Sequence, residues 1–430
     1  MRKSTILSAI FLLCVHAASA EESGRTYVGV EPARPRMVPY NRAADAVVDD
    51  SRTSRYVAPA LQWQQRGDTL VASFAKPVAW VNRQVLVRVG GAECAYEVEV
   101  NGETAGYAPC GVGAAEYNVT SLTKDDMNEL RVVLRRDVPA DRLCAATTTK
   151  GVRDVEVVCQ PTIRVRDIFS RTQLNDSGDG VTEVGVAVKC NALNDKACRL
   201  HYVLRANDTL VVAEGYRDMQ LDMRREDTVR FACVVPKALL WSAASPKMLR
   251  LDIENRIDNR PSEYVSREMG FREAHLREGV LYVNGEPVTM HLVEASELKS
   301  LDDVAQRGGN GVVLTSDHEA EALLRECDRR GLYAVVCVPI DVSGQGDNIR
   351  RGGNPTNDRS WREAFIERNE RSYHSVKYHP SVVGYMIARG RTSGICIYDT
   401  FLRLKQLVLD MPVFYPGAGS EWCSDKVSIK

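Results

Sequence analysis

Gly311-Val-Val-Leu-Thr315 and Ala334-Val-Val-Cys-Val338 are two short apolar runs, and the amphipathic pattern of a helix, residues 319–330, separates them. Runs without alternating polar residues are typical of strands buried on both faces, as in parallel sheets. Strands that alternate with helical patterns indicate βα units, and a second helical pattern covers residues 398–409. The sequence therefore predicts an α/β domain over residues 271–430.

The two regions before residue 271 have a different pattern of apolar and polar residues. Apolar and polar residues alternate from residue 68 to 138, with turn signals at Gly67-Asp68, Gly90-Gly91 and Asn101-Gly102. This pattern predicts antiparallel strands and a β-sandwich over residues 21–160. About seven short strand-like runs follow in residues 161–270, which suits an immunoglobulin-like sandwich. We expect a multidomain β and α/β protein.

The N-terminus has the layout of a cleaved secretory signal. Arg2 and Lys3 precede an apolar run from Ile6 to Ala18, and Ala18-Ser19-Ala20 supplies a cleavage site. Residues 1–20 are therefore predicted to be a signal peptide, and the protein to be periplasmic, envelope-associated or extracellular. A lipoprotein signal through Cys14 is the alternative. The apolar run is too short for a spanning helix and no later run approaches eighteen apolar residues, so we expect no membrane span.

Composition argues against several classes of partner. The 56 basic and 57 acidic residues give a net charge of −1, so no basic field for nucleic acid or anionic lipid is expected. No Cys-x-x-Cys or His-x-x-x-His spacing occurs, which gives no support for a metal site. We predict no cofactor.

Twelve cysteines occur, and removing Cys14 with the signal leaves an odd number. Since export implies an oxidising compartment, at least one thiol is expected to stay unpaired or to bond another chain. Cys190 and Cys198 bracket a turn-like stretch between two strand-like runs and are the best disulfide candidate. Weaker pairings join Cys94 with Cys110 and Cys144 with Cys159.

One segment of the α/β region carries a family resemblance. Lys377-Tyr-His-Pro-Ser-Val-Val-Gly-Tyr-Met-Ile-Ala-Arg-Gly390 resembles the fourth barrel strand of family 2 glycoside hydrolases, which include β-galactosidases and β-glucuronidases. That family reads roughly Asn-His-Pro-Ser-Ile/Val-x-x-Trp-Ser-Leu-Gly-Asn-Glu. Further stretches that resemble family motifs follow in family order: Val100–Tyr107, Gly151–Val158, Glu268–Arg272, Leu281–Pro287, Cys327–Tyr333 and Pro412–Tyr415.

The resemblance implies a fold for each domain. Residues 21–160 would be a sugar-binding-like jelly roll and residues 161–270 the immunoglobulin-like sandwich. Residues 271–430 would be a partial TIM-type barrel that ends near strand five, because a full barrel takes about 250 residues.

The resemblance also implies lost chemistry. Arg389 and Gly390 stand where the family has Asn-Glu, and that Glu protonates the leaving sugar oxygen. The family nucleophile lies on a strand beyond residue 430. Because retaining hydrolysis needs two carboxylates, we expect a catalytically inactive homologue. A residual O-glycosyl hydrolase is the alternative.

Polar residues remain at the predicted C-terminal ends of the strands, where barrel sites are built. Asp317, His318, Asp341 and Arg389 are candidate glycan ligands. They are otherwise loop residues, and Asp317 is then the cap of the helix that follows it. Trp361 is either a sugar-stacking platform or, as the family pattern favours, a core residue.

Two roles beyond hydrolysis are left open. A glycan-binding protein is one, and an interaction or assembly subunit of an envelope complex is the other. The second follows from an open barrel, since exposed strand edges and an apolar face need cover. We predict that a second copy, another protein or the chain's own residues 417–430 supply this cover.

Overall fold

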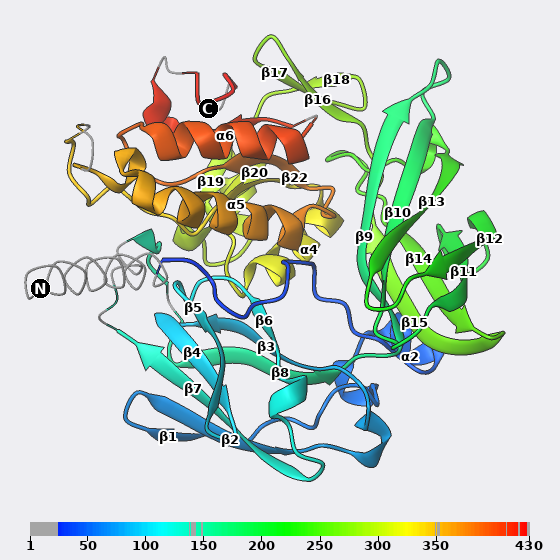
Figure 1. Cartoon of the computed structure of the whole chain (residues 1–430). Coiled ribbons are helices and arrows are strands. Elements are labelled where there is room, and N and C mark those ends of the chain that lie inside the picture. The colour runs from blue at the N-terminus through cyan, green and yellow to red at the C-terminus, as the bar shows by residue number, and fades with distance from the viewer. Residues whose placement is uncertain are drawn as a thin grey trace, which may run out of the picture.

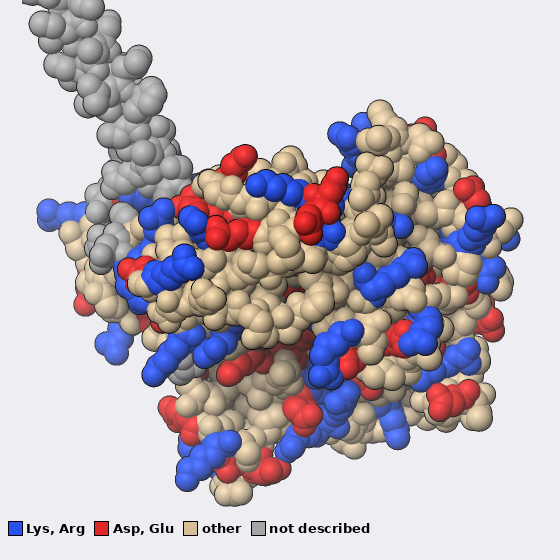
Figure 2. All heavy atoms as spheres, turned by 90° about the horizontal axis from the view of Figure 1, so that it is seen from below, with Lys and Arg blue, Asp and Glu red and all other residues tan. Residues whose placement is uncertain are grey.

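The computed structural model describes residues 25–136, 138, 143–147, 149–348, 350, 353–409, 411–419 and 422–427. The predicted signal peptide and Cys14 lie outside these ranges. No helix within the described ranges is long and apolar enough to cross a membrane. On the face shown in Figure 2, basic and acidic side chains are interspersed, as the nearly balanced composition suggests.

Residues 64–159 form a first β-sandwich, which lies at the bottom of Figure 1. Its two antiparallel sheets share one core, to which Val87, Tyr96, Tyr117 and Leu130 contribute from different strands. One sheet has the order β1 (Gln64–Arg66), β2 (Thr69–Ala75), β7 (Met127–Arg135), β4 (Ala95–Val100) and β5 (Glu103–Ala108). The other has the order β6 (Ala115–Asn118), β3 (Val85–Ala92) and β8 (Val152–Cys159).

A second sandwich covers residues 163–269 and holds seven strands, the number that the sequence predicts. Both of its sheets are antiparallel and enclose one apolar core. The first sheet has the order β13 (Glu226–Val235), β10 (Gly180–Cys190) and β9 (Ile163–Leu174). The second has the order β12 (Val211–Leu221), β11 (Lys196–Arg205), β14 (Leu249–Ile257) and β15 (Arg260–Met269).

The predicted parallel strands form one five-stranded sheet. Its order is β19 (Leu292–Glu294), β20 (Gly311–Thr315), β21 (Tyr333–Cys337), β22 (Val382–Met386) and β23 (Val413–Phe414). The helices of this region are α3 (Asp302–Gln306), α4 (Ala320–Arg330), α5 (Arg362–Val376) and α6 (Ile395–Leu407). The described residues contain no closed barrel.

The two faces of the parallel sheet have different cover. Side chains such as Val336 pack in one core with helices α4, α5 and α6, while Val335 and Cys337 pack in another. That second core includes residues of a hairpin sheet, β16 (Ala274–Arg277), β17 (Val280–Val283) and β18 (Glu286–Val288). Val427 also packs there, and the carboxylate of Asp425 accepts from the backbone N–H of Val413 at 2.9 Å. Residues 422–427 therefore lie against the sheet, as one predicted form of cover requires.

Residues 25–57, which we call the N-terminal arm, contact both sandwiches and the α/β region. The arm is the dark blue segment of Figure 1 and contains helix α2 (Ala43–Val48). Arg25 stacks over the Trp361 ring at 4.2 Å, Val30 pairs with Tyr117, and Tyr40 pairs with Tyr264. Trp361 itself is 5% exposed and belongs to the helix-side core, as the core interpretation predicts.

Two motifs that stand far apart in the sequence meet in the core. Asp328, at the end of α4, accepts a hydrogen bond from the backbone N–H of Ser381 at 3.0 Å. Its other oxygen lies 2.6 Å from Nδ1 of His379. Both side chains of this Asp–His pair are at most 4% exposed. The contact fixes the loop that enters β22 against α4.

The predicted disulfides are wrong. Cys190 and Cys198 are separate thiols, because they lie on different sheets of the second sandwich and the Cys198 thiol donates to Asn255 Oδ1 at 2.8 Å. Cys110 is bonded to Cys144 instead, so neither the pairing with Cys94 nor that of Cys144 with Cys159 forms. Spacing along the sequence could not find this pair, since residue 144 is brought back to the first sandwich by tertiary contacts.

Candidate functional site

The predicted site residues follow strands that end at one edge of the parallel sheet. Thr315 pairs with Cys337, and Cys337 with Met386, so β20, β21 and β22 end side by side. The segments that follow β21 and β22 also pair with each other, through a parallel β-bridge between Asp341 and Arg389. This edge is where a βα sheet presents side chains from neighbouring strands together.

An ion pair lies at the centre of this edge. Arg389 donates from both terminal nitrogens to the two carboxylate oxygens of Glu294, each at 2.8 Å. Glu294 ends β19, so the pair joins the first and fourth parallel strands. The hydrogen bond to Glu294 raises the pKa of Arg389. The two side chains are 31% and 35% exposed, so solutes can reach them.

Gly390 has no room for a side chain. A Cβ atom built there would lie 2.4 Å from Val342 Cγ2 and 2.6 Å from the Tyr415 hydroxyl. Its φ of +156° is also a backbone conformation that residues with side chains rarely adopt. Tyr415 is held in place because its hydroxyl donates to the carbonyl of Thr392 at 3.0 Å. The position that the sequence resemblance predicts for an acid/base residue therefore has no space for a carboxylate side chain.

Asp341 and Cys337 adjoin the ion pair but have local roles. Asp341 Oδ1 accepts from the backbone N–H of Ser343 at 2.8 Å and from its hydroxyl at 2.6 Å, which is a turn interaction. Burial raises the pKa of the Cys337 thiol to about 12. The thiol is thus protonated at neutral pH and is not an activated nucleophile.

Asp317 and His318 face a different neighbour. Asp317 Oδ1 accepts from the backbone N–H of Glu319 at 3.0 Å, and burial raises the pKa of this carboxyl. Glu319 is the N-cap residue of α4 and that end of the helix has no side-chain cap, so Asp317 is not the cap. His318 Nδ1 lies 3.2 Å from the hydroxyl of Thr149, and its Cβ lies close to Gly91 of the first sandwich. The structure therefore brings together Asp341 and Arg389. His318 instead contacts the first sandwich, and Asp317 makes a local turn interaction.

A segment from the first sandwich borders the site. Leu143 accepts through its carbonyl from the backbone N–H of Asp341 at 2.8 Å, and Cys144 pairs with Ile340. The disulfide between Cys110 and Cys144 ties this segment to the sandwich. Part of this loop, including Arg142 and Thr148, lies outside the described residues.

Glu294 is the site residue that sequence reasoning missed. It lies in His291-Leu-Val-Glu-Ala-Ser-Glu297, outside the stretches that resemble family motifs. The available signal was the arginine at residue 389, because a partly buried cation favours an anion nearby. No cluster of three metal-ligating side chains occurs among the residues that the structure describes.

The comparisons with known proteins agree with this architecture. No family model matches the sequence. The β-galactosidase of Yersinia pestis biovar Antiqua (strain Angola) is 27% identical over 362 residues, covering 77% of this chain and 34% of that protein. The β-galactosidase of Priestia megaterium is 23% identical over 375 residues, covering 81% of this chain and 36% of that protein.

A solved structure resembles the fold. Bacteroides uniformis β-glucuronidase superposes with a TM-score of 0.65 at 17% identity, over 90% of this chain and 52% of that one. The chain is thus similar to β-galactosidases in sequence and to glycoside hydrolases of family 2 in fold. It spans about a third of the length of the curated family 2 relatives that it matches.

Proposed function

We propose that this family 2 relative does not hydrolyse glycosides. The observation that carries the proposal is Gly390, which replaces the acid/base carboxylate and leaves no space for one between Val342 and Tyr415. The ion pair of Arg389 with Glu294 neutralises the nearest carboxylate of the edge. Without a proton donor the leaving sugar oxygen is not protonated, and this acid is one of the two groups on which retaining hydrolysis depends.

Aryl β-galactosides and β-glucuronides test this proposal, because the relatives are named for those activities. We expect no release of the aryl alcohol above the buffer rate. Turnover that copurifies with the protein and disappears on the substitution Glu294→Gln would contradict the proposal. The exposed substitution Glu183→Gln, on β10 of the second sandwich, is the control.

Restoring the family residues should not restore activity. The double substitution Arg389→Asn and Gly390→Glu returns the Asn-Glu pair, yet the new side chain would collide with Val342 and Tyr415. We expect turnover to stay at the buffer rate and the melting temperature to fall. A rise in turnover of ten-fold or more would show that the site is blocked only by the two substitutions.

Glycan binding without cleavage is the role that the partly exposed ion pair favours. Charged and hydroxyl-bearing side chains at Glu294, Arg389 and Ser343 can exchange hydrogen bonds with sugar hydroxyls. A glycan array followed by titration calorimetry tests this role. Binding that Arg389→Ala weakens ten-fold, and that Arg199→Ala on the outer face of β11 leaves unchanged, would support it. The absence of any bound glycan would contradict it.

Export is proposed from residues 1–20, which lie outside the described residues. N-terminal sequencing of the protein recovered from a cell fraction tests it. We expect the mature chain to begin at Glu21 in an envelope or extracellular fraction. Recovery of an intact Met1 form from the cytoplasm alone would contradict export.

A further inference from the structure

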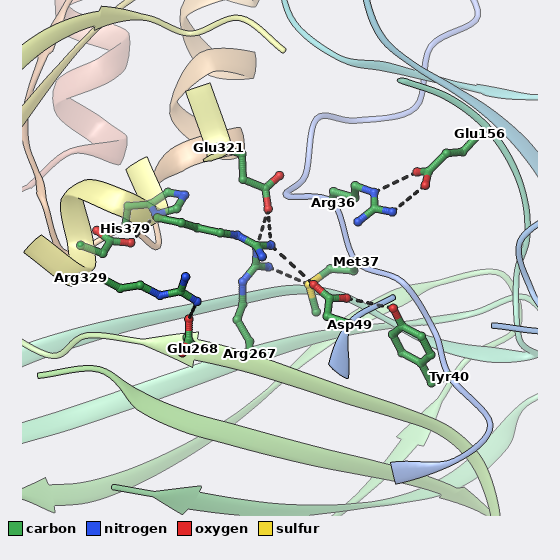
Figure 3. Close-up of polar contacts among 12 residues, drawn as sticks. Arg36, Met37, Tyr40, Asp49, Glu156, Arg267, Glu268, Glu321, Arg329 and His379 are labelled. Atoms are coloured by element: carbon green, nitrogen blue, oxygen red, sulfur yellow. Dashed lines mark hydrogen bonds and ion pairs between the residues drawn. The ribbon is translucent and has the colours of Figure 1, made fainter. Parts of the chain in front are cut away.

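A second cleft, of about 320 Å³, lies at the opposite end of β22 from the strand-end site. The N-terminal arm, the second sandwich and α4 surround it, as Figure 3 shows. Arginines predominate among its charged residues. The five arginines are Arg36, Arg250, Arg267, Arg325 and Arg329, and the three acidic residues are Asp49, Glu268 and Asp328.

Four of the five arginines have a carboxylate partner within 3.2 Å. These ion pairs orient the walls of the cleft, and Glu268 is the partner carboxylate that also lines it. The four pairs are Arg36 with Glu156 at 2.6 Å, Arg250 with Asp208 at 3.2 Å, Arg325 with Glu321 at 2.7 Å, and Arg329 with Glu268 at 2.6 Å.

Arg267 is different. It is 8% exposed, and its Nη1 donates to the thioether sulfur of Met37 at 2.8 Å. Its other contacts are Glu321 at 3.8 Å and the face of the Tyr378 ring, whose centroid lies 3.5 Å from the guanidinium carbon. A thioether is a weak acceptor, whereas a guanidinium carries five donors. Arg267 therefore retains hydrogen-bonding capacity that these contacts do not use.

His379 presents a second unused polar atom. Its Nδ1 is engaged by Asp328, and its Nε2 has no hydrogen-bond partner among the described residues, although the side chain is only 1% exposed. The imidazole lies against Tyr378, with ring centroids 4.1 Å apart, so Arg267 and His379 contact the same aromatic ring. Leaving a buried polar atom unpaired costs about 1–3 kcal/mol, which a bound ligand recovers.

We propose that this cleft binds a compact oxyanion of the phosphate class. The planar guanidinium of Arg267 supplies paired N–H donors, the geometry that suits a phosphate group. His379 Nε2 donates when the ring is protonated, or accepts from the hydroxyl of a hydrogen phosphate. Arg325 and Arg329 reach the cleft from α4. Glu268 is engaged by Arg329, and Asp49 by Arg325 and the Tyr40 hydroxyl.

The test uses the full mature chain and inorganic phosphate. Thermal unfolding and titration calorimetry are run in sodium phosphate and in sodium chloride of equal ionic strength, with sodium sulfate and a hexose 6-phosphate as further arms. We expect phosphate to raise the melting temperature saturably, because a ligand of the folded state stabilises it. If the hexose 6-phosphate raises the melting temperature more than inorganic phosphate does, the ligand is a sugar phosphate.

Matched variants decide whether the cleft is responsible. Arg267→Gln should weaken phosphate binding at least ten-fold, and Arg199→Gln, an exposed arginine paired with Asp218 on the second sandwich, should not change it. If Arg267→Gln does not fold, Arg267→Lys keeps the charge and loses the planar donors, and it should weaken binding similarly. Equal phosphate responses in the wild type and the Arg267 variant that folds, or no response in the wild type, would overturn the proposal.

Discussion

Asp328 holds the loop before β22 through His379 and Ser381, and all three side chains are buried. Removing Asp328 leaves a buried ring nitrogen of His379 and the backbone N–H of Ser381 without partners, and at about 1–3 kcal/mol for each group this costs about 2–6 kcal/mol. We expect Asp328→Ala to lower the free energy of unfolding in urea by that amount. The exposed control Asp176→Ala should change it by less than about 0.5 kcal/mol. Equal effects of the two substitutions would contradict this role.

Glu263 gives stability a pH dependence. Burial raises its pKa to about 8, whereas the unfolded chain titrates near 4.3. Between these values the unfolded state has lost the proton that the folded state keeps, so stability is full below about pH 4 and falls as pH rises toward 8. The slope approaches about 1.4 kcal/mol per pH unit.

Glu263→Gln should remove this slope. Urea unfolding at pH 5.5 and 7.5 should show a smaller loss of stability in the variant than in the wild type, and the variant should be the more stable of the two at pH 7.5. The control Glu183→Gln, at a side chain 59% exposed, should keep the wild-type slope. Parallel slopes for the wild type and Glu263→Gln would contradict the assignment.

Single residues were predictable only where the chain itself carried the signal. The Arg389-Gly390 replacement could be recognised from the sequence, because both residues lie inside the stretch 377–390 that resembles a family motif. Glu294 could not, because its importance comes from an arginine that arrives 95 positions later. The pairing of Cys110 with Cys144 failed for a similar reason, since it depends on where a loop packs and not on spacing.

The segment 143–147 is an element without regular structure that depends on its disulfide. The bond between Cys110 and Cys144 spans 34 residues, and closing a loop of that size stabilises the folded state by about 3–4 kcal/mol. We expect the double substitution Cys110→Ser and Cys144→Ser to lower unfolding stability by about that amount under oxidising conditions. Cys233→Ser is the control, since Cys233 is outside any disulfide.

The same disulfide experiment has a second outcome to check. A reductant should lower the stability of the wild type and leave the double variant unchanged. If the reductant affects both proteins equally, its effect does not arise from this bond.

For helices and strands, the sequence predicted the type of element better than the residues at which each element begins and ends. The uninterrupted apolar runs predicted β20 and β21, because strands buried on both faces need no polar alternation. The second helix was predicted over residues 398–409, but α6 runs from Ile395 to Leu407. Its first turn packs into the core through Cys396 and Ile397, a tertiary contact that the amphipathic pattern did not include.

At the scale of the whole molecule, the N-terminal arm forms ion pairs with both sandwiches. Arg34 lies 2.9 Å from Glu226 of the second sandwich, and Arg36 lies 2.6 Å from Glu156 of the first. We expect calorimetry to show one unfolding transition in the wild type and separated transitions in the double variant Arg34→Ala and Arg36→Ala. The control, Arg42→Ala with Arg52→Ala, removes exposed arginines paired within the arm and should keep one transition.

Association of the mature protein is a prediction at the same scale. The terminal strands of the parallel sheet, β19 and β23, have only three and two residues, although residues 422–427 lie against the β23 end. We propose that a second copy or another protein covers the remaining edge. Light scattering after gel filtration tests this, and a monodisperse monomer without dye-accessible apolar surface would contradict it.

The contact between the N-terminal arm and the α/β region also determines when the arm can reach its native position during translation. Arg25 stacks on Trp361, which is translated 336 residues later. At synthesis rates of roughly 5–20 residues per second, that interval is about 17–67 seconds. During this time the sandwiches can form, but the arm has no α/β partner to bind. The end of the arm around Arg25 is therefore among the last of the described parts to reach its native place, and it is exposed to chaperones for this whole interval.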